Sequence, residues 1–297
     1  MKILCIGATN KDIIGVSYDA VVIEDSNPGR VQMKLGGVAK NIAENLFRLG
    51  EDVDLLTFIG KDIFGVDTVD YFETLGLPFT HSYIDDLRPT GIYMAVHGSS
   101  GELIAAINDF SLIESIEPSF FSSMSEYINQ FDTIVLDTNL SEKTLHYIIE
   151  TYKEKRIICD GVSQIKVNRL KHVLKYVDLL KVNKQELSSL LSQKNDDIIM
   201  DVKRLLETGV KHVVVTNGKD AITYNTEGRI YQTLIFEPSE IKSSAGAGDA
   251  LLSGIIYGLN HGKSMHEAVN LGKKAASLTM EVDQACNPLL SKVLIEE

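Results

Sequence analysis

Short runs of apolar, β-branched residues alternate along the chain with segments in which apolar residues recur at helical spacing. Runs of this length and composition are typical of buried strands, and they predict strands at Lys2–Ile6, Val53–Ile59, Thr133–Asp137, Arg156–Asp160, Asp178–Lys181 and His212–Thr216. Helical periodicity predicts helices at Ala39–Leu49, Val66–Leu75, Glu142–Tyr152, Gln185–Leu191 and Ile198–Glu207. Strands that alternate with helices indicate an α/β fold, with a mostly parallel central sheet covered by helices on both faces.

Two stretches interrupt this alternation, and we expect them to form a small separate sheet. Residues 13–35 and 79–108 contain alternating apolar and polar runs, with turn dipeptides at Pro28-Gly29 and Ser100-Gly101. The runs predict strands at Tyr18–Ile23, Arg30–Leu35, Gly91–His97 and Glu102–Ile107. Because no Pro/Ser-rich linker divides the chain, we interpret residues 1–297 as a single α/β domain whose two insertions form a β-sheet lid.

The predicted lid also suggests how the chain associates. Open strand edges and apolar sheet faces need covering, and the runs Gly91–Ala95 and Val21–Ile23 are apolar. We therefore expect a homodimer formed through the lid.

Charge and cysteine usage narrow the function classes. The chain has 41 acidic and 29 basic side chains and a formal net charge of −12, which opposes nucleic acid as a partner because such binding depends on Lys and Arg. Cys5, Cys159 and Cys286 are widely spaced and predict neither a disulfide framework nor a zinc site. The chain lacks an apolar run of membrane-spanning length and a signal peptide. We therefore expect a cytoplasmic protein without a membrane partner.

The sharpest chemical signal is Ser243–Asp249, which leads into an apolar segment, Asp249–Leu259, that predicts a buried helix. A second helix is predicted at Met265–Val282. Gly246 and Gly248 let the backbone approach a ligand closely, and N–H groups at a helix N-terminus bind anions. A carboxylate beside such an anion fits a base that takes a proton from an attacking hydroxyl in phosphoryl transfer. The alternative is a glycine-rich loop whose aspartate caps the helix.

Polar residues follow several predicted strands at their carboxyl ends, where open α/β sheets bind ligands. One more glycine pair, Gly36-Gly37, opens a helix and places Asn41 in its first turns. The spacing of Asn183 and Glu186 puts both on one helix face. The polar segments at strand ends are Ala8–Asp12, Asp137–Asn139, Asn183–Glu186 and Thr216–Gly218. Together with the glycine pair, they predict one shared crevice.

These motifs, in this order, resemble those of the ribokinase (PfkB) family of carbohydrate kinases. Gly36-Gly37 with Asn41 corresponds to the family's N-terminal glycine motif, and Asn183-x-x-Glu186 to its NxxE motif. Gly246-Ala247-Gly248-Asp249 matches the GAGD signature, which is the most specific of the set. The resemblance covers essentially the whole chain and implies a ribokinase-like fold, with a Rossmann-like core and a β-lid.

The resemblance implies an ATP-dependent phosphotransferase and gives roles to these positions. Asp249 would be the catalytic base. The backbone amides of Ala245–Gly248, which include those of Gly246, Ala247 and Gly248, would form the anion hole. Asn183 and Glu186 would organise Mg²⁺ and its waters. Thr216, Gly218, Gly246 and Gly248 would bind ATP together with Asn183. The sugar hydroxyls would be held by Asp12, Gly36, Gly37 and Asn41.

Further segments are similar to the pseudouridine kinases of this family. They are Ser26–Arg30 followed by GGVAKNIAENLFRLG, Ala106–Phe110, Asp137–Ser141, Leu278–Glu281 and Asn287-Pro288. Asn139 stands where ribokinases carry a glutamate, and an amide keeps a hydrogen bond to a hydroxyl while dropping a charge. This resemblance implies phosphorylation of the pseudouridine 5′-hydroxyl, with the base read by Asn10, Ser26, Asn27 and Asp109. A kinase for ribose, fructose phosphate or a purine nucleoside, and a non-catalytic sensor, stay as alternatives.

Three positions depart from the family pattern. Ser243 replaces an aspartate that helps a monovalent-cation site in many relatives, so potassium dependence stays open. Ala221 replaces the last glycine of a TxGxxG motif that begins at Thr216, and Val182 replaces a proline before Asn183. None of these changes removes the expected base or anion hole.

Overall fold

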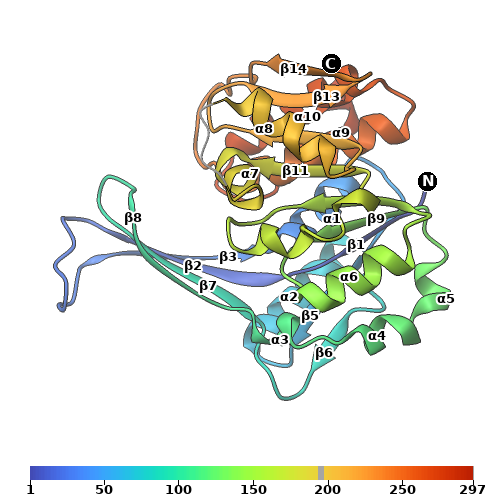
Figure 1. Ribbon diagram of the computed structural model, residues 1–297. Coiled ribbons are helices and arrows are strands. Elements are labelled where there is room, and N and C mark those ends of the chain that lie inside the picture. Colours follow the sequence, from blue (N-terminus) through green and yellow to red (C-terminus); the bar gives the residue numbers. More distant parts are fainter. Residues whose placement is uncertain (193–196, 297) are drawn as a thin grey trace.

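The computed structural model, which describes residues 1–192 and 197–296, is built on a central eight-stranded sheet. Six strands are parallel, and β13 and β14 add an antiparallel hairpin at one edge (Figure 1). The strand order is β14 (Arg229–Thr233), β13 (Ile222–Thr226), β12 (His212–Thr216), β11 (Leu179–Asn183), β10 (Arg156–Asp160), β9 (Thr133–Asp137), β1 (Ile3–Ile6) and β4 (Val53–Leu56).

Helices cover both faces of this sheet. In β9, Ile134 and Leu136 pack on one side, while Val135 packs on the other, as the alternation of a strand requires. The first side is covered by α6 (Glu142–Thr151), α7 (Lys184–Leu190) and α8 (Ile198–Glu207), and the second by α1 (Val38–Arg48), α2 (Ile63–Leu75), α9 (Ala247–Asn260) and α10 (Met265–Met280). The predicted α/β fold is therefore confirmed. None of the described helices is long and apolar enough to cross a membrane.

A separate four-stranded sheet extends from one side of this core (Figure 1). It pairs the strands in the order β3 (Gly29–Gly36), β2 (Asn10–Ser17), β7 (Gly91–His97) and β8 (Leu103–Asp109). Two of the predicted lid strands lie close to β3 and β8, and the third coincides with β7. The predicted small sheet is therefore confirmed, and we call it the lid.

One predicted lid strand is wrong. Tyr18–Ile23 lies in the loop between β2 and β3, and the strand itself begins at Asn10, directly after the first core strand. The Asn27 side chain holds this loop, because its Oδ1 accepts from Val22 N at 2.7 Å and its Nδ2 donates to Val22 O at 2.9 Å. The segment Ala8–Asp12, which the sequence predicts as a polar end of the first core strand, thus runs into β2.

The predicted strand Val53–Ile59 is also divided. Thr57 breaks the run, because its hydroxyl donates to Gly7 O at 2.8 Å while its backbone bonds to the segment that precedes β6. The chain then leaves the main sheet, and β5 (Phe58–Gly60) pairs with β6 (Tyr83–Asp85). The elements that the sequence pattern missed are β6, β13, β14, α3 (Ser111–Glu114), α4 (Pro118–Ser123), α5 (Ser125–Ile128) and α11 (Lys292–Glu296).

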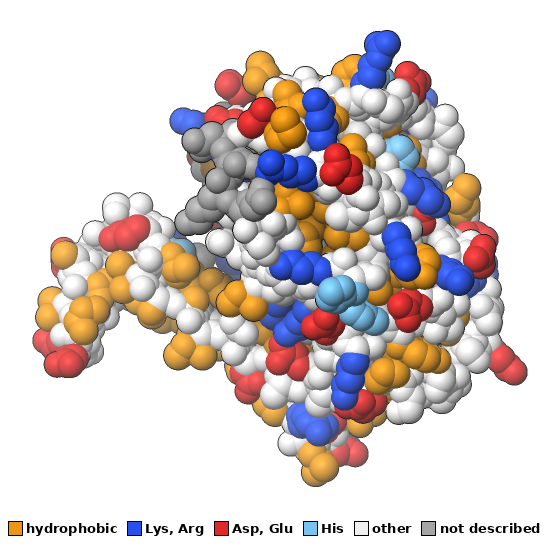
Figure 2. All heavy atoms as spheres, in the orientation of Figure 1, with side chains coloured by type: hydrophobic (Ala, Val, Ile, Leu, Met, Phe, Trp, Pro, Cys, Tyr) orange, Lys and Arg blue, Asp and Glu red, His pale blue; other side chains and the backbone are white. Residues whose placement is uncertain are grey.

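The two faces of the lid differ in chemistry. Asp12, Tyr93 and Asn108 pair across β2, β7 and β8 and line a pocket against the core. The next row, Ile13, Met94 and Ile107, points to the opposite face by strand alternation. There Met94 and Ile107 are exposed. Figure 2 shows the lid as an arm with apolar side chains along it.

Candidate functional site

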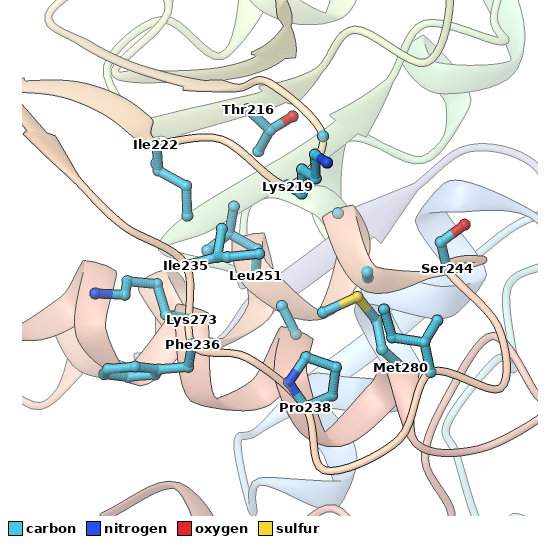
Figure 3. Close-up of a pocket in the computed structure, with 15 residues that line it drawn as sticks. Thr216, Lys219, Ile222, Ile235, Phe236, Pro238, Ser244, Leu251, Lys273 and Met280 are labelled. Carbon is cyan, nitrogen blue, oxygen red and sulfur yellow. The ribbon is translucent and has the colours of Figure 1, made fainter.

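Two pockets flank the N-terminus of α9. The first, which we call the apolar pocket, has a volume of about 350 Å³ and lies between β13, α9 and α10 (Figure 3). Its walls are Ile222, Ile235, Phe236, Pro238, Ile241, Leu251, Ala276 and Met280, with Thr216, Gly218, Lys219, Ser244, Ala247, Gly248 and Lys273 adding polar groups and backbone. A slot of this kind suits a flat heterocyclic ring that carries a polar tail.

The second pocket, which we call the polar pocket, has a volume of about 410 Å³ and lies under the lid. Its lining combines lid residues with residues from the carboxyl ends of core strands. They are Asn10, Asp12, Gly37, Val38, Asn41, Tyr93, Asn108, Phe110, Asn139, Val162, Ser163 and Lys166. Amides and hydroxyls dominate this lining, which suits a ligand with many hydroxyl groups.

Asp249 lies between the two pockets. It is buried, and its Oδ2 accepts a hydrogen bond of 2.8 Å from Nδ2 of Asn41, which lines the polar pocket. On the other side it directly follows Gly248, which lines the apolar pocket. Its own backbone oxygen is bonded to Ser253 at 2.7 Å, within the same helix. Asp249 itself lines neither pocket, but its carboxylate bonds to a residue of the polar pocket and its backbone continues from a residue of the apolar pocket.

The start of α9 requires glycine at Gly246. The residue has a φ of 76°, and a Cβ there would lie 1.8 Å from the oxygen of Ala285. Any side chain would force the turn away from the C-terminal segment and disturb the amides that follow. These N–H groups begin a helix of 14 residues, and a helix N-terminus attracts anions.

The environment of Asp249 makes it a stronger base than an ordinary carboxylate. Burial raises its pKa from the usual acidic range to about 7, and the negative charge of Asp160 adds to the rise. Lys181, the hydrogen bond from Asn41 and Lys40 act in the opposite direction. A group that titrates near neutral pH is suited to accepting a proton from a hydroxyl.

Most of the residues predicted to bind the sugar or nucleoside lie together in the polar pocket. Asn10, Asp12, Gly37, Asn41 and Asn139 all line the polar pocket. The carboxylate of Asp12 accepts a hydrogen bond of 2.6 Å from Asn10, and it occupies the space that a side chain at Gly36 would need.

The three other predicted base-reading residues are not brought into either pocket. Ser26 and Asn27 lie in the loop at the end of the lid. Asp109 is exposed at the end of β8, where its carboxylate accepts from Ser111 N at 3.0 Å, next to Asn108, which does line the polar pocket.

Two basic residues that sequence reasoning missed support Asn139. Lys166 Nζ donates to Asn139 Oδ1 at 2.7 Å and lies 4.1 Å from the ring centroid of Phe110. Arg169 donates to the oxygens of Thr138 and Asn139 at 3.1 and 3.0 Å. Burial lowers the pKa of Lys166. Both residues lie in the polar segment after β10. This segment follows the carboxyl end of a strand, as the other predicted site segments do, and that position could have indicated their role.

A second missed pair lies beside Asp249. Lys181 in β11 and Asp160 in β10 are both buried, and Nζ lies 3.0 Å from Oδ2. A lysine inside an otherwise apolar strand was the signal.

Thr216 and Gly218 line the apolar pocket, as do Ala247 and Gly248. Ala221, which replaces a glycine, keeps a negative φ, so the substitution brings no backbone strain. Asn183 and Glu186 form a capping box at the start of α7. Glu186 Oε2 accepts from Asn183 N at 2.8 Å, and Asn183 Oδ1 accepts from Glu186 N at 2.8 Å.

The capping box is compatible with Mg²⁺ held through water. Glu186 is buried and supplies a hard oxygen donor, but both of its oxygens already accept N–H groups from Asn183. Its remaining lone pairs suit bound waters, and Mg²⁺ keeps several waters when it accompanies phosphates. Among the described residues, no cluster of three or more His, Cys, Asp and Glu side chains could enclose a metal by itself.

Known proteins of one family match almost the whole chain. The profile described as "pfkB family carbohydrate kinase" matches residues 1–292. The chain is 27% identical to the pseudouridine kinase of Escherichia coli (strain K12) over 292 residues, covering 97% of this chain and 93% of that protein. It is 26% identical to the guanosine-inosine kinase of Exiguobacterium acetylicum over 288 residues, covering 93% of each.

The fold matches as well. The structure of Arabidopsis thaliana ribokinase complexed with ribose and ATP has a TM-score of 0.85 at 19% identity, covering 100% of this chain and 99% of that one. The predicted ribokinase-like fold is therefore confirmed.

We expect the Asn41→Ala variant to raise the pKa of Asp249 above its value of about 7, because the variant loses a hydrogen bond that favours the carboxylate. The ¹³C shift of the Asp249 carboxyl, followed from pH 5 to 9, would measure this pKa. Asn139→Ala changes the same pocket and is expected to leave the titration unchanged. An Asn41→Ala curve that overlays the wild-type curve would contradict the assigned contact.

Proposed function

The chain belongs to the PfkB family of carbohydrate kinases, and from this premise we propose that it transfers the γ-phosphoryl group of ATP to the 5′-hydroxyl of pseudouridine. At the coarser level, it is a phosphotransferase of the sugar and nucleoside kinase class. The observation that carries the proposal is the buried Asp249, with a pKa near neutral, between an apolar pocket and a polar pocket.

In the proposed reaction, ATP places its base in the apolar pocket and its phosphates at the N-terminus of α9. The nucleoside lies in the polar pocket with its 5′-hydroxyl beside Asp249. The carboxylate takes the hydroxyl proton as the oxygen attacks phosphorus, and the bond to the ADP oxygen breaks. The amides of Ala247 and Gly248 stabilise the charge on the transferring group. Bound Mg²⁺ would neutralise phosphate charge, and Asn183 with Glu186 would hold its waters.

The nucleobase proposal is supported by the side chains in the polar pocket. Lys166, Asn10 and Asn108 can donate to the carbonyl oxygens of a uracil ring, and Asn139 and Asn10 can accept from its N–H groups. Pseudouridine carries one more ring N–H than uridine. A site that bonds this N–H penalises uridine, because its buried acceptor then stays unpaired.

The loop that holds Ser26 and Asn27 is proposed to contact the nucleobase only when the lid moves toward the core. We keep these two residues and Asp109 as base-reading residues under that condition. Closure of the lid would also exclude water, which otherwise competes as the phosphoryl acceptor.

We expect Asp249→Asn to lower kcat by about 10²–10⁴-fold, because the variant removes the general base without changing its size. Steady-state ADP release measures kcat, and calorimetry should show ATP binding close to that of wild type. Asp132→Asn, at an exposed carboxylate by the start of β9, is the matched control with unchanged kcat. Full activity of Asp249→Asn would refute the role of this residue.

For the acceptor, we expect pseudouridine to give the highest kcat/KM in a panel with uridine, ribose, fructose 6-phosphate, guanosine and inosine. The margin over uridine should be about 100-fold or more, because the difference is a buried hydrogen bond. A coupled ADP assay measures each acceptor. A higher value for another acceptor would reject pseudouridine and retain the kinase. Tight binding of an acceptor without ADP release would instead favour a sensor.

We further propose that the chain is a single domain whose lid, from insertions at about 13–35 and 79–108, pairs with the lid of a second copy. The exposed row on its outer face supports this, with Met33, Met94 and Ile107 exposed by 62%, 44% and 65%. Val31 and Val96 extend the same apolar face and are also exposed. Contiguous apolar surface of this kind typically marks a protein interface.

We expect light scattering to give the mass of a dimer for wild type and that of a monomer for the variant Met94→Lys/Ile107→Lys, because two charges would be buried in the interface. Leu87→Lys is the matched control, because Leu87 lies before β7, outside the four strands of the lid sheet, and is 92% exposed. This variant should stay dimeric. A monomeric wild type would refute the interface.

A further inference from the structure

Lys181 places a buried ammonium at the first turn of α9. The residue is 8% exposed, and its Nζ lies 2.6 Å from the point where a Cβ of residue 248 would be. Gly248 thus leaves room for this ammonium, which occupies the space beside the amides of the proposed anion hole. Among the described residues, Lys181 is the basic residue that contacts the position of Gly248.

Two sources of positive potential therefore converge on one point. A helix N-terminus carries a partial positive charge, and a cation beside it is repelled. Burial of the Lys181 ammonium also carries an unfavourable desolvation free energy. In the free protein the carboxylates of Asp160, Asp249 and Glu186 offset this cost. An anion in the space between the ammonium and the amides would be attracted by both.

Asp160 holds the ammonium in this place. Its Oδ2 lies 3.0 Å from Lys181 Nζ, and its Oδ1 accepts from Val162 N at 2.9 Å. Val162 has a φ of 59°, which is strained for a β-branched residue. The turn that carries Asp160 is thus fixed at a cost in backbone energy, and strain of this kind is typical of functional sites.

We propose that Lys181 is a second catalytic residue, whose ammonium contacts the phosphoryl group during transfer, and that Asp160 is the positioning residue that holds it. The proposal rests on the proposed function. In the step, the acceptor oxygen forms a bond to phosphorus, the bond from phosphorus to the ADP oxygen breaks, and the acceptor proton moves to Asp249. Lys181 keeps its protons and offsets the charge that spreads over the phosphoryl oxygens.

The same pair influences the base. Asp160 raises the proton affinity of Asp249 and Lys181 lowers it, so the removal of either alone shifts the acid limb of the pH profile. The titratable and charged groups that face Asp249 from the elements around it are Asp160 of β10, Lys181 of β11, Lys40 of α1 and Cys286 of the C-terminal segment.

The test uses the double variant Lys181→Met/Asp160→Asn, because it removes both charges of the ion pair together and leaves neither partner without the other. We expect kcat to fall about 100-fold or more, as for loss of one preorganised donor, while the KM of the acceptor changes less than about threefold. The matched control is Lys211→Met/Asp178→Asn, which removes a Lys–Asp ion pair at the opposite ends of the strands and should keep wild-type kcat.

A binding measurement makes the test independent of the acceptor. ADP with Mg²⁺ and aluminium fluoride mimics the transferring group, and its affinity should fall about 100-fold in the double variant, while the affinity for ADP alone stays constant. The single variant Asp160→Asn should shift the acid limb of the pH profile of kcat/KM to lower pH than in wild type, because Asp160 raises the pKa of Asp249. A purely structural defect would not cause this shift.

The outcomes separate the two proposals. Wild-type protein that turns over no acceptor refutes the proposed function, and the fluoride complex still tests Lys181. A double variant that binds the fluoride complex as tightly as wild type, or that keeps kcat within threefold of an active wild type, overturns the role of Lys181.

Discussion

The buried carboxylate of Asp137 joins the segments on which the polar pocket is built. Its Oδ2 accepts from Ala8 N at 2.8 Å and Ala39 N at 3.1 Å, and its Oδ1 accepts from Asn139 N at 2.9 Å. Burial raises the pKa of this carboxyl, while the three N–H donors act against the rise. Gly7 has no side chain because its Cβ would lie 2.4 Å from the carboxylate carbon. One side chain therefore fixes the end of β1, the start of α1 and the segment after β9.

The buried charges around Asp249 carry a cost in stability. Buried charges contribute little net stability even when they are paired, and an unpaired one destabilises strongly. Here Asp249, Asp160 and Lys181 are buried within one small region at the strand ends. Packing of α9 against α1 and α10 supplies the apolar contacts that hold this charged cluster together, since Leu252, Ile255 and Ile256 are fully buried.

The lid uses the alternation of its strands for two purposes. Odd and even positions along β2 and β7 point to opposite faces, so Asp12 and Tyr93 enter the polar pocket while Ile13 and Met94 face outward. A shift in register by one residue would exchange the two sets. The pocket-facing side and the outer side of the lid are therefore coupled through the same hydrogen-bonded pairs, and a contact that orders one face also positions the other.

The sequence by itself determined the alternation of the parallel core strands with helices, the presence of the small sheet and the glycine-rich start of α9. These features depend on local periodicity and on backbone conformation within a few residues. The contact of Asn41 with Asp249 joins helices α1 and α9, and that of Lys166 with Asn139 joins the segments after β10 and β9. Both depend on tertiary packing, which no local pattern encodes. The lysine in β11 looked like a strand residue until the structure placed its ammonium against Gly248. Tertiary structure alone decided these contacts, because each joins residues of separate elements through the order and register of the sheet.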